Sequence, residues 1–262
     1  MDNTPKGLFV GSLAKGLRVL RAFDEKQTEM SLSELVRKTG LDKSSVQRLS
    51  NTLYLEGFLD KDEVTRRFRP SLAWLEMAHA YYWSDPLVAL AMAKLIDLSR
   101  DLGETVNLAR LSGSNIIYVF RLPSTRSRFA GTIPGNKLPA LGTATGRAVL
   151  STWDPVSREN ALRDWPTRAV TPATVLDRDQ IAREVEDAAL KGYSITHGQA
   201  LINEVSIAAP IRDTSGRATA AVQCSVSGLL WDHDQIITKI VPALTNTANS
   251  ITSPSRAGYT NT

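Results

Sequence analysis

The chain has 262 residues, of which 42% are hydrophobic and 22% are charged, close to the composition of an average globular protein. That length is enough for one large domain or for two domains of ordinary size. No apolar run approaches the roughly 18 residues that a membrane helix needs, and the first ten residues lack the pattern of a secretory signal. We therefore expect a cytoplasmic protein without membrane contact.

The residues that bind metals or form disulfides are few. Cys224 is the only cysteine, so an intramolecular disulfide is impossible, and the three histidines lie far apart in the sequence. We expect no metal site and no cofactor. The formal net charge of +4 permits binding to nucleic acid but is also common in proteins that have no such partner.

Two short helices joined by a tight turn are predicted after a first amphipathic helix near the N-terminus. Ser31 and Glu34 have the spacing of a capping box, which predicts that a helix starts there. Gly40 is suited to the left-handed conformation that ends such a helix, and Asp42 or Ser44 can cap the next one. Two helices connected in this way form a helix-turn-helix.

The second of these helices has an apolar and a polar face. Val46, Leu49 and Leu53 recur at helical spacing and are expected to face the core. The other side carries side chains that donate to guanine, adenine or phosphate oxygens. The helix residues that we predict to contact DNA are Lys43, Ser44, Ser45, Gln47, Arg48 and Asn51.

A short hairpin is predicted next, where the sequence alternates around a polar turn between Gly57 and Pro70. Its return strand carries Arg66, Arg67 and Arg69, which could reach phosphates or the minor groove. One polar helix face alone is usually only a solvated surface. The order of capping box, glycine turn, polar helix and arginine-bearing hairpin favours a winged helix-turn-helix that binds double-stranded operator DNA.

The rest of the chain mixes helices with antiparallel hairpins, which predicts an α+β fold. A helix rich in tryptophan and tyrosine follows the hairpin and is expected either to pack on neighbouring helices or to form part of a dimer interface. Strands are predicted in ETVNLARL, NIIYVFRL, VSIAAPI and RATAAVQCSVS. The predicted domains are a DNA-binding domain over 1–70, a linker and dimerisation helix over 71–85, an effector-binding domain over 86–252 and a disordered tail over 253–262.

Seven segments, in this order, resemble the IclR family of transcriptional regulators, named after the isocitrate lyase regulator. They are SLAKGLRVLRAF, LSELVRKTGLDKSSVQRLSNTLYLEGFL, GETVNLARL, LPALGTATGRAVL, TPATVLD, SIAAPIRDTSGR and SVSG. The resemblance implies a winged helix-turn-helix joined by a linker helix to a GAF-like effector-binding domain, assembled as a homodimer or a dimer of dimers. We accordingly expect a repressor of a catabolic operon whose operator binding responds to a small effector.

The resemblance also implies where the effector binds. Transferred from the family's segments, the pocket residues are Thr143, Ala144, Thr145, Ser206, Ser225 and Ser227. Many relatives have a glycine at Asn203 and acidic residues around His197, so we add these two positions and expect an anionic effector such as a carboxylate.

Two other functions compete with this one. The C-terminal domain could serve only for oligomerisation and sense no ligand. A small-molecule hydrolase is the other alternative, but the sequence has no G-x-S-x-G elbow and no Walker loop. Cys224 lies in a predicted buried strand, where burial keeps a thiol unreactive. We therefore predict no catalytic residues.

Overall fold

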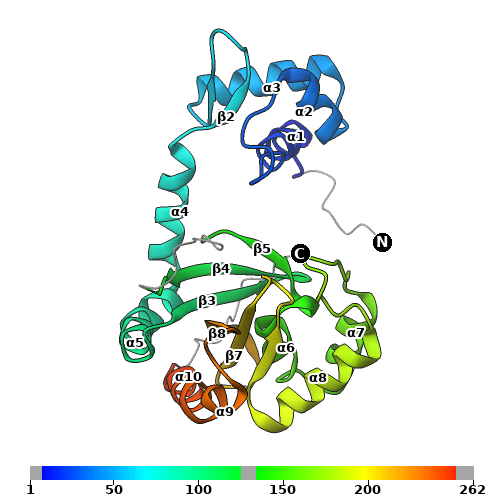
Figure 1. The fold of residues 1–262 in the computed structure, drawn as a ribbon. Helices are drawn as coiled ribbons and strands as arrows, with labels where there is room; N and C mark the ends of the chain where they lie inside the picture. Colours follow the sequence, from blue (N-terminus) through cyan, green and yellow to red (C-terminus); the bar gives the residue numbers. More distant parts are fainter. Residues whose placement is uncertain (1–7, 125–133, 252–262) are drawn as a thin grey trace. The chain divides into compact units, whose positions relative to one another are not determined.

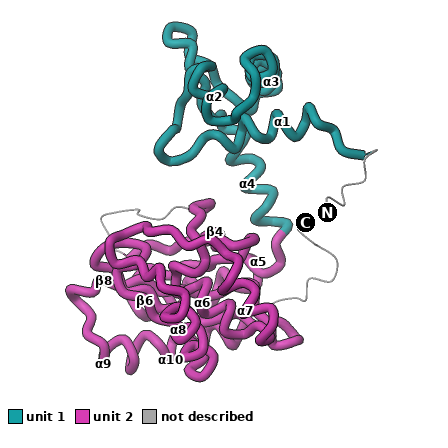
Figure 2. Tube along the Cα trace, turned by 90° about the vertical axis from the view of Figure 1, so that its right-hand side faces the viewer, with its two compact units in different colours: residues 1–84 teal, residues 85–262 magenta. Residues whose placement is uncertain are grey.

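The chain forms two compact units, residues 1–84 and 85–262, which Figure 2 colours separately. The computed structural model describes residues 8–124 and 134–251. The tail predicted over 253–262 therefore lies outside the described residues.

The first unit is a winged helix-turn-helix followed by a further helix (Figure 1). Ser31 and Glu34 form the predicted capping box, in which the Ser31 amide donates to Glu34 Oε2 at 2.7 Å. Gly40 ends that helix with a φ of +67°, and Asp42 caps the next by accepting from the Ser45 amide at 2.8 Å. The elements are α1 (Gly11–Leu20), α2 (Leu32–Thr39), α3 (Lys43–Leu55), β1 (Leu59–Lys61), β2 (Phe68–Pro70) and α4 (Ala73–Ser84).

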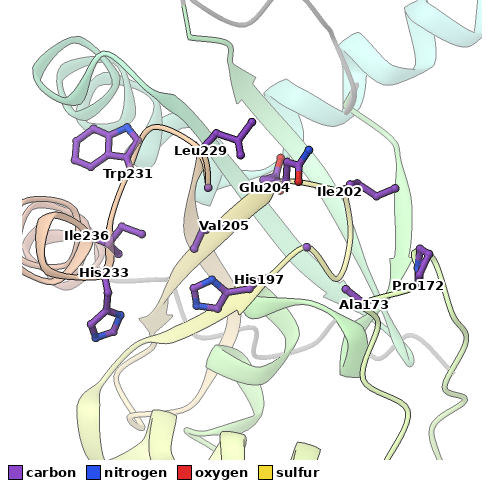
Figure 3. Close-up of a pocket in the computed structure, with 13 residues that line it drawn as sticks. Pro172, Ala173, His197, Ile202, Glu204, Val205, Leu229, Trp231, His233 and Ile236 are labelled. Carbon is purple, nitrogen blue, oxygen red and sulfur yellow. The ribbon is translucent and has the colours of Figure 1, made fainter.

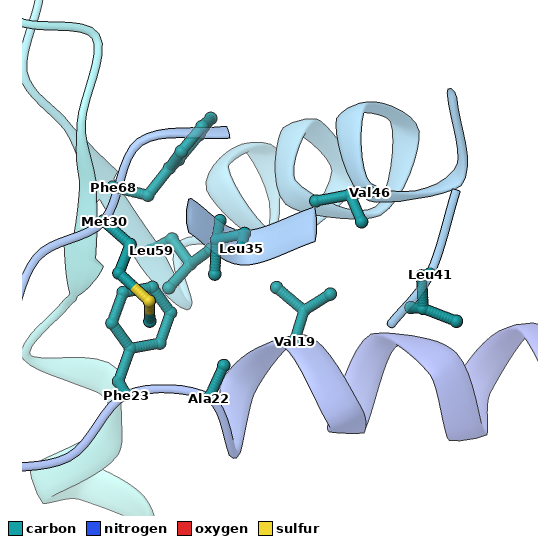
Figure 4. Close-up of a cluster of buried hydrophobic side chains, with 9 residues drawn as sticks. All are labelled: Val19, Ala22, Phe23, Met30, Leu35, Leu41, Val46, Leu59 and Phe68. Atoms are coloured by element: carbon teal, nitrogen blue, oxygen red, sulfur yellow. The ribbon is translucent and has the colours of Figure 1, made fainter. Parts of the chain in front are cut away.

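One hydrophobic core holds these helices and the hairpin together (Figure 4). It draws side chains from α1, α2, α3 and both strands of the hairpin, and its members are Val19, Ala22, Phe23, Met30, Leu35, Leu41, Val46, Leu59 and Phe68. On α1 the buried residues are Gly16 and Val19, whereas Leu13 and Leu17 remain exposed. Helix α1 therefore has a second apolar face, formed by Leu13 and Leu17, which no other part of this unit covers.

The aromatic helix α4 is attached to the first unit at its start only. Trp74 packs edge-on against Phe23 with ring centres 6.4 Å apart, and its indole donates to the Phe58 carbonyl at 2.9 Å. No residue of α4 is fully buried, and Trp83 is 82% exposed. The helix ends at Ser84, as Pro86 predicts.

The second unit is an α+β domain built on one antiparallel sheet. Its strands are ordered β5-β4-β3-β8-β7-β6. The strands are β3 (Thr105–Ser112), β4 (Asn115–Leu122), β5 (Lys137–Pro139), β6 (Ser194–His197), β7 (Glu204–Arg212) and β8 (Ala218–Ser227). The helices are α5 (Pro86–Leu102), η1 (Ala140–Gly142), α6 (Ala144–Leu150), α7 (Pro155–Asp164), α8 (Arg178–Lys191), α9 (His233–Gln235), η2 (Ile236–Ile240) and α10 (Val241–Ser250).

Helices cover both faces of this sheet. Helices α5 and α10 contact each other and pack on β3, β4, β7 and β8, whereas α6 packs on β7 and β8 and contacts α8 (Figure 1). The α6 layer is sealed by small side chains, because Ala144 and Ala148 meet Ala208, Ala218 and Ala221 of the sheet. The predicted α+β fold is confirmed, including the four predicted strands.

A buried arginine ties α6 to its surroundings. The Arg147 side chain is fully buried and donates to the Leu141 carbonyl and to Gln199 Oε1, each at 2.9 Å. It also forms an ion pair with Glu184 of α8. These three contacts fix the start of α6 relative to α8 and to the loop after β6.

The last helix contains a wider turn. Residues Ile236–Ile240 form a π-helical turn between α9 and α10. Pro242 follows it and has no amide hydrogen to donate to the carbonyl four residues earlier, so a regular helix would lose a bond here. Ile236, Ile240 and Leu244 are nonetheless all buried.

Candidate functional site

The predicted recognition helix α3 presents a polar face to solvent. Val46 and Ser50 are buried, whereas Lys43, Ser44, Gln47, Arg48 and Asn51 are exposed. Together these five side chains offer ammonium, hydroxyl, amide and guanidinium donors along one helix. This arrangement is suited to reading base edges in a major groove.

Ser45 is less available for DNA than its neighbours. It is half-buried, and its amide donates to the Asp42 side chain that caps α3. The Ser45 hydroxyl is the largest cause that lowers the pKa of Asp42, followed by the Ser45 amide. Ser45 therefore supports the helix start.

The predicted wing is the hairpin of β1 and β2, in which Asp60 pairs with Arg69 and Lys61 with Phe68. Asp62 holds its turn by accepting from the Thr65 amide at 2.6 Å. Arg66 follows with a φ of +58°, an uncommon value for a residue other than glycine. Its exposed side chain stands at the end of that turn.

The three wing arginines differ in their surroundings. Arg67 binds Glu29 at 3.0 Å and Glu34 at 2.9 Å, and thereby joins the wing to the start of α2. Arg69 is exposed and lies 3.3 Å from Asp60. Arg66 has no ion pair among the described residues, which leaves it best placed for a phosphate.

In the second unit the face of the sheet toward α6 carries a row of polar side chains. Because paired residues in antiparallel strands point to the same side, Ser206, Ser225 and Thr105 share this face, and so do Ala208, Gln223 and Asn107. Ala208 packs against α6, which identifies the side. At β7 and β8 the opposite face carries Val205, Ile207, Cys224 and Val226, which are all buried.

Five side chains on this face form a continuous line of hydrogen bonds from β4 to β7. Arg121 donates to Asn107 Oδ1 at 3.4 Å, and Asn107 donates to Gln223 Oε1 at 2.5 Å. Gln223 Nε2 then donates to Ser206 Oγ at 3.0 Å, and Ser206 Oγ donates to Glu204 Oε1 at 2.7 Å.

Ser225 forms a branch at the end of this line. Gln223 Nε2 donates to Ser225 Oγ at 2.7 Å. Burial raises the pKa of Glu204 above its usual value. The hydrogen bonds from Ser206 and Ser225 lower this pKa, but by less than burial raises it. The two predicted serines are thus brought together around a carboxylate.

Three other residues predicted to bind the effector, Thr143, Ala144 and Thr145, lie at the start of α6. The Thr143 hydroxyl donates to the Ala140 carbonyl and accepts from the Gly146 amide, both at 3.0 Å. Ala144 belongs to the packed alanine layer. The buried Thr145 hydroxyl has no hydrogen-bond partner among the described residues.

His197 and Asn203 lie elsewhere. His197 pairs with Val205, so its side chain lies on the face opposite Thr196 and Ser206. Both residues line a cavity of about 420 Å³ with Trp231 and His233, and Figure 3 shows His197 among the side chains that line it. This cavity lies beside α9, and Glu204 is the one member of the hydrogen-bonded line that also borders it.

Ser227 follows the hydrogen-bonded Ser225 on β8 and precedes Gly228, which lines the cavity. It pairs with Glu204, and its hydroxyl accepts from the Leu229 amide at 3.3 Å in the turn after β8. The structure therefore brings Ser206, Ser225 and Ser227 together, whereas it separates His197 from them.

Four residues of this candidate site were not predicted from the sequence, namely Asn107, Arg121, Glu204 and Gln223. Each is a polar residue in an otherwise apolar strand, which is the pattern that could have revealed them. Glu204 also places a carboxylate at the edge of the cavity that His197 lines.

Other chemistries find little support. Burial raises the pKa of the Cys224 thiol above its usual range, which keeps it protonated. No three His, Cys, Asp or Glu side chains within 8–124 and 134–251 could hold a metal ion together. Across the same residues, no helix has the length and apolarity needed to span a membrane.

Two family models match the chain. The "IclR helix-turn-helix domain" matches residues 12–63, and the "bacterial transcriptional regulator IclR C-terminal" domain matches residues 79–253. The chain belongs to the IclR family. It is a DNA-binding transcriptional regulator with an IclR C-terminal domain, as predicted.

Relatives with known roles are similar over most of the chain. The Pca regulon regulatory protein of Pseudomonas putida is 30% identical over 83% of this chain and 74% of its own length. The p-hydroxybenzoate hydroxylase transcriptional activator of Acinetobacter baylyi is 27% identical over 93% and 91%. These IclR-family relatives are regulators and not enzymes, which agrees with the prediction.

Solved structures of the IclR family share the fold. The regulator from Alicyclobacillus acidocaldarius has a TM-score of 0.82 at 23% identity, covering 93% of this chain and 98% of that one. An IclR homolog from Microbacterium hydrocarbonoxydans, complexed with 4-hydroxybenzoate, has a TM-score of 0.74 at 24% identity, covering 92% and 97%.

Proposed function

We propose that this chain controls a catabolic operon by binding operator DNA through α3 and the wing, and that a small organic acid bound on the polar face of the second unit changes that binding. The exposed polar face of α3 carries the first part of the proposal. Gln47 and Arg48 are the residues best suited to read bases, and Arg66 and Arg69 are suited to hold phosphates.

The DNA-binding proposal is tested by titrating operator fragments in gel-shift experiments. Gln47→Ala and Arg48→Ala should each weaken specific binding by about 1 to 3 kcal/mol and relax base preference. Arg183→Ala removes an exposed arginine from α8 and serves as the control for the loss of one charge. Unchanged operator affinity in both α3 variants would contradict the assignment.

The effector proposal rests on the line of polar side chains that ends at Ser206, Ser225 and Glu204. A ligand can change operator affinity only if it binds two arrangements of the protein differently, and a coupling of about 1 to 3 kcal/mol is the usual range. Small carboxylates, including the 4-hydroxybenzoate bound by the Microbacterium homolog, are the first probes.

A thermal-shift screen detects such a ligand, because binding to the folded state alone raises the melting temperature. Ser225→Leu should abolish the response to the hit while leaving operator affinity nearly unchanged. Ser225→Ala repeats the test with a smaller change, and Ser215→Leu in the exposed β7–β8 turn is the control. A full response in both Ser225 variants would place the effector elsewhere, and a domain that binds nothing would favour an oligomerisation role.

We further propose that the protein is a homodimer, or a dimer of dimers, assembled through α4. The helix exposes Leu75, Met77, Tyr81 and Trp83, more apolar surface than a helix in water usually carries. A dimer would also engage two half-sites about one helical turn apart.

Light scattering measures this directly and should give about twice the chain mass of 28.6 kDa, or four times that mass. Trp83→Asp should lower the mass toward that of one chain, whereas Leu190→Asp, at an exposed apolar position of α8, should not. A monomeric wild-type protein with full operator affinity would refute the dimer.

A further inference from the structure

Among the described residues, neither of the two opposite charges at the ends of the hydrogen-bonded line forms an ion pair, although each charge acts on the other through space. Arg121 is half-buried, and its one described bond is the one to Asn107. Glu204 is half-buried too and accepts from serine hydroxyls, and no cation lies within ion-pair distance of it among the described residues. Charges withdrawn from water without a partner cost free energy, so both ends are sites where an added group of opposite charge would stabilise the protein.

The charged groups at the two ends determine which group donates and which accepts in each hydrogen bond of the line. A guanidinium can only donate, so Asn107 must present its oxygen to Arg121 and its NH₂ group to Gln223. Gln223 must then accept with its oxygen and present its own NH₂ group to Ser206 and Ser225. A carboxylate at Glu204 can only accept, which agrees with this direction.

The serine protons are therefore already used. Each hydroxyl accepts from Gln223, and its single proton is directed at Glu204. Neither Ser206 nor Ser225 has a proton left for a carboxylate ligand. The group that faces a ligand at this end is the Glu204 carboxylate, which is the one residue of the line that also borders the cavity lined by His197 and Trp231.

We propose that the effector carries two groups: an anionic group that pairs with the Arg121 guanidinium, and a hydrogen-bond donor, such as a hydroxyl or an ammonium, that binds the Glu204 carboxylate. This inference rests on the effector site proposed above and specifies its ligand class. A simple carboxylate lacks the donor and leaves Glu204 without a partner. A neutral alcohol or an amine lacks the anion and leaves Arg121 unpaired.

The test compares matched probes on the full-length wild-type protein by isothermal titration or thermal shift. The acid-with-donor set contains 3- and 4-hydroxybenzoate, lactate and 4-aminobutanoate. The acid-only set contains the O-methyl ethers, benzoate, propanoate and butanoate, and the donor-only set contains phenol and butylamine. The hits should come from the acid-with-donor set. O-methylation of the hit's hydroxyl, or replacement of its amine by hydrogen, should weaken binding at least tenfold, because a site that binds a donor rejects the analogue that lacks it.

Two variants separate the two contacts. Glu204→Gln should reduce the discrimination between the acid with a donor and its acid-only analogue to less than about threefold, since the amide can donate as well as accept. Arg121→Gln should weaken both acids by a similar factor and leave their ratio unchanged. Glu186→Gln and Arg183→Gln make the same charge changes on exposed positions of α8 and should alter neither quantity.

Each outcome has one meaning. Acid-only probes that bind wild type as tightly as their donor-bearing partners would overturn this ligand class while leaving an effector site in place. Unchanged discrimination in Glu204→Gln would overturn the role of Glu204. If no set binds, the effector response proposed above fails, and this inference fails with it. The wild-type comparison requires no variant to fold.

Discussion

Replacing Gly146 by alanine should destabilise the second unit, although alanine is the better helix former. Gly146 lies in the first turn of α6, where its amide donates to the Thr143 side chain at 3.0 Å. A β-carbon added here would fall onto the Ala140 carbonyl oxygen and lie 2.7 Å from Ala140 Cα. These are backbone atoms of η1 and cannot turn away as a flexible side chain would.

The expected change in the free energy of unfolding is the sum of one stabilising and two destabilising effects. Alanine is favoured over glycine inside a helix by about 1 kcal/mol. Overpacking against atoms that must shift the backbone costs about 1 to 3 kcal/mol or more. A shift of η1 would also disturb the Thr143 cap, which is worth about 1 kcal/mol. We therefore expect a net loss of about 1 to 3 kcal/mol.

Urea unfolding followed by circular dichroism measures the difference, with Gly16→Ala as the matched control. The β-carbon of that variant would meet only Leu49 Cδ2, at the ordinary contact distance of 3.8 Å. Gly16→Ala should be neutral or stabilising by up to about 1 kcal/mol. A Gly146→Ala protein as stable as wild type would refute the steric reasoning.

Three further predictions concern charged residues. Arg147→Ala should destabilise the second unit by about 3 to 5 kcal/mol, because the Leu141 carbonyl, Gln199 Oε1 and the Glu184 carboxylate lose their donor; a loss below about 1 kcal/mol in urea unfolding would contradict this. The Ser31 amide, the Ser31 hydroxyl and then Arg67 lower the pKa of Glu34 from 4.5 to about 2, so its contribution to stability is present above pH 4.5 and lost as the pH falls toward 2. Glu34→Gln should flatten the pH dependence of unfolding in that window, and an unaltered profile would argue against the shift. Arg66→Ala should reduce the slope of the salt dependence of DNA binding, measured by gel shift, by about one charge. Arg67→Ala should mainly lower the melting temperature of the first unit. If Arg67→Ala changed the salt slope and Arg66→Ala the melting temperature, the two roles would have to be exchanged.

Elements with strong local signals could be predicted from the sequence. The capping box at Ser31, the left-handed glycines at Gly40 and Gly192 and the proline at Pro86 each mark a helix boundary through interactions within a few residues. Helix α7 carries such marks as well, an Asp154 cap and Pro155 at its first position, but they were not used to assign it from the sequence. The short strands β5 and β6 lack them. They depend on tertiary packing, and the sequence analysis did not assign them.

The members of the proposed effector site could be predicted only in part, because they meet through the register of the sheet. Ser206 and Ser225 were named, but Arg121 lies three strands away from Glu204 in the sheet order. His197 and Thr196 are neighbours in sequence, and their alternation places them on opposite faces. A shift of one residue in the assumed register would exchange these roles, which the sequence does not specify by itself.

The π-helical turn before α10 affects how the chain tolerates insertions and deletions. Buried residues of the last helix recur every fourth position, at Ile236, Ile240, Leu244 and Ala248. In a regular α-helix, residues four apart drift by about 40° around the axis at each step, and the wider turn takes up part of that drift. Removal of one residue from Ile236–Ile240 would restore a regular helix and rotate α9 by about 100°. His233 would then leave the cavity that it lines. A relative that lacks one residue at this turn is therefore expected to line the cavity with a different side chain at this point.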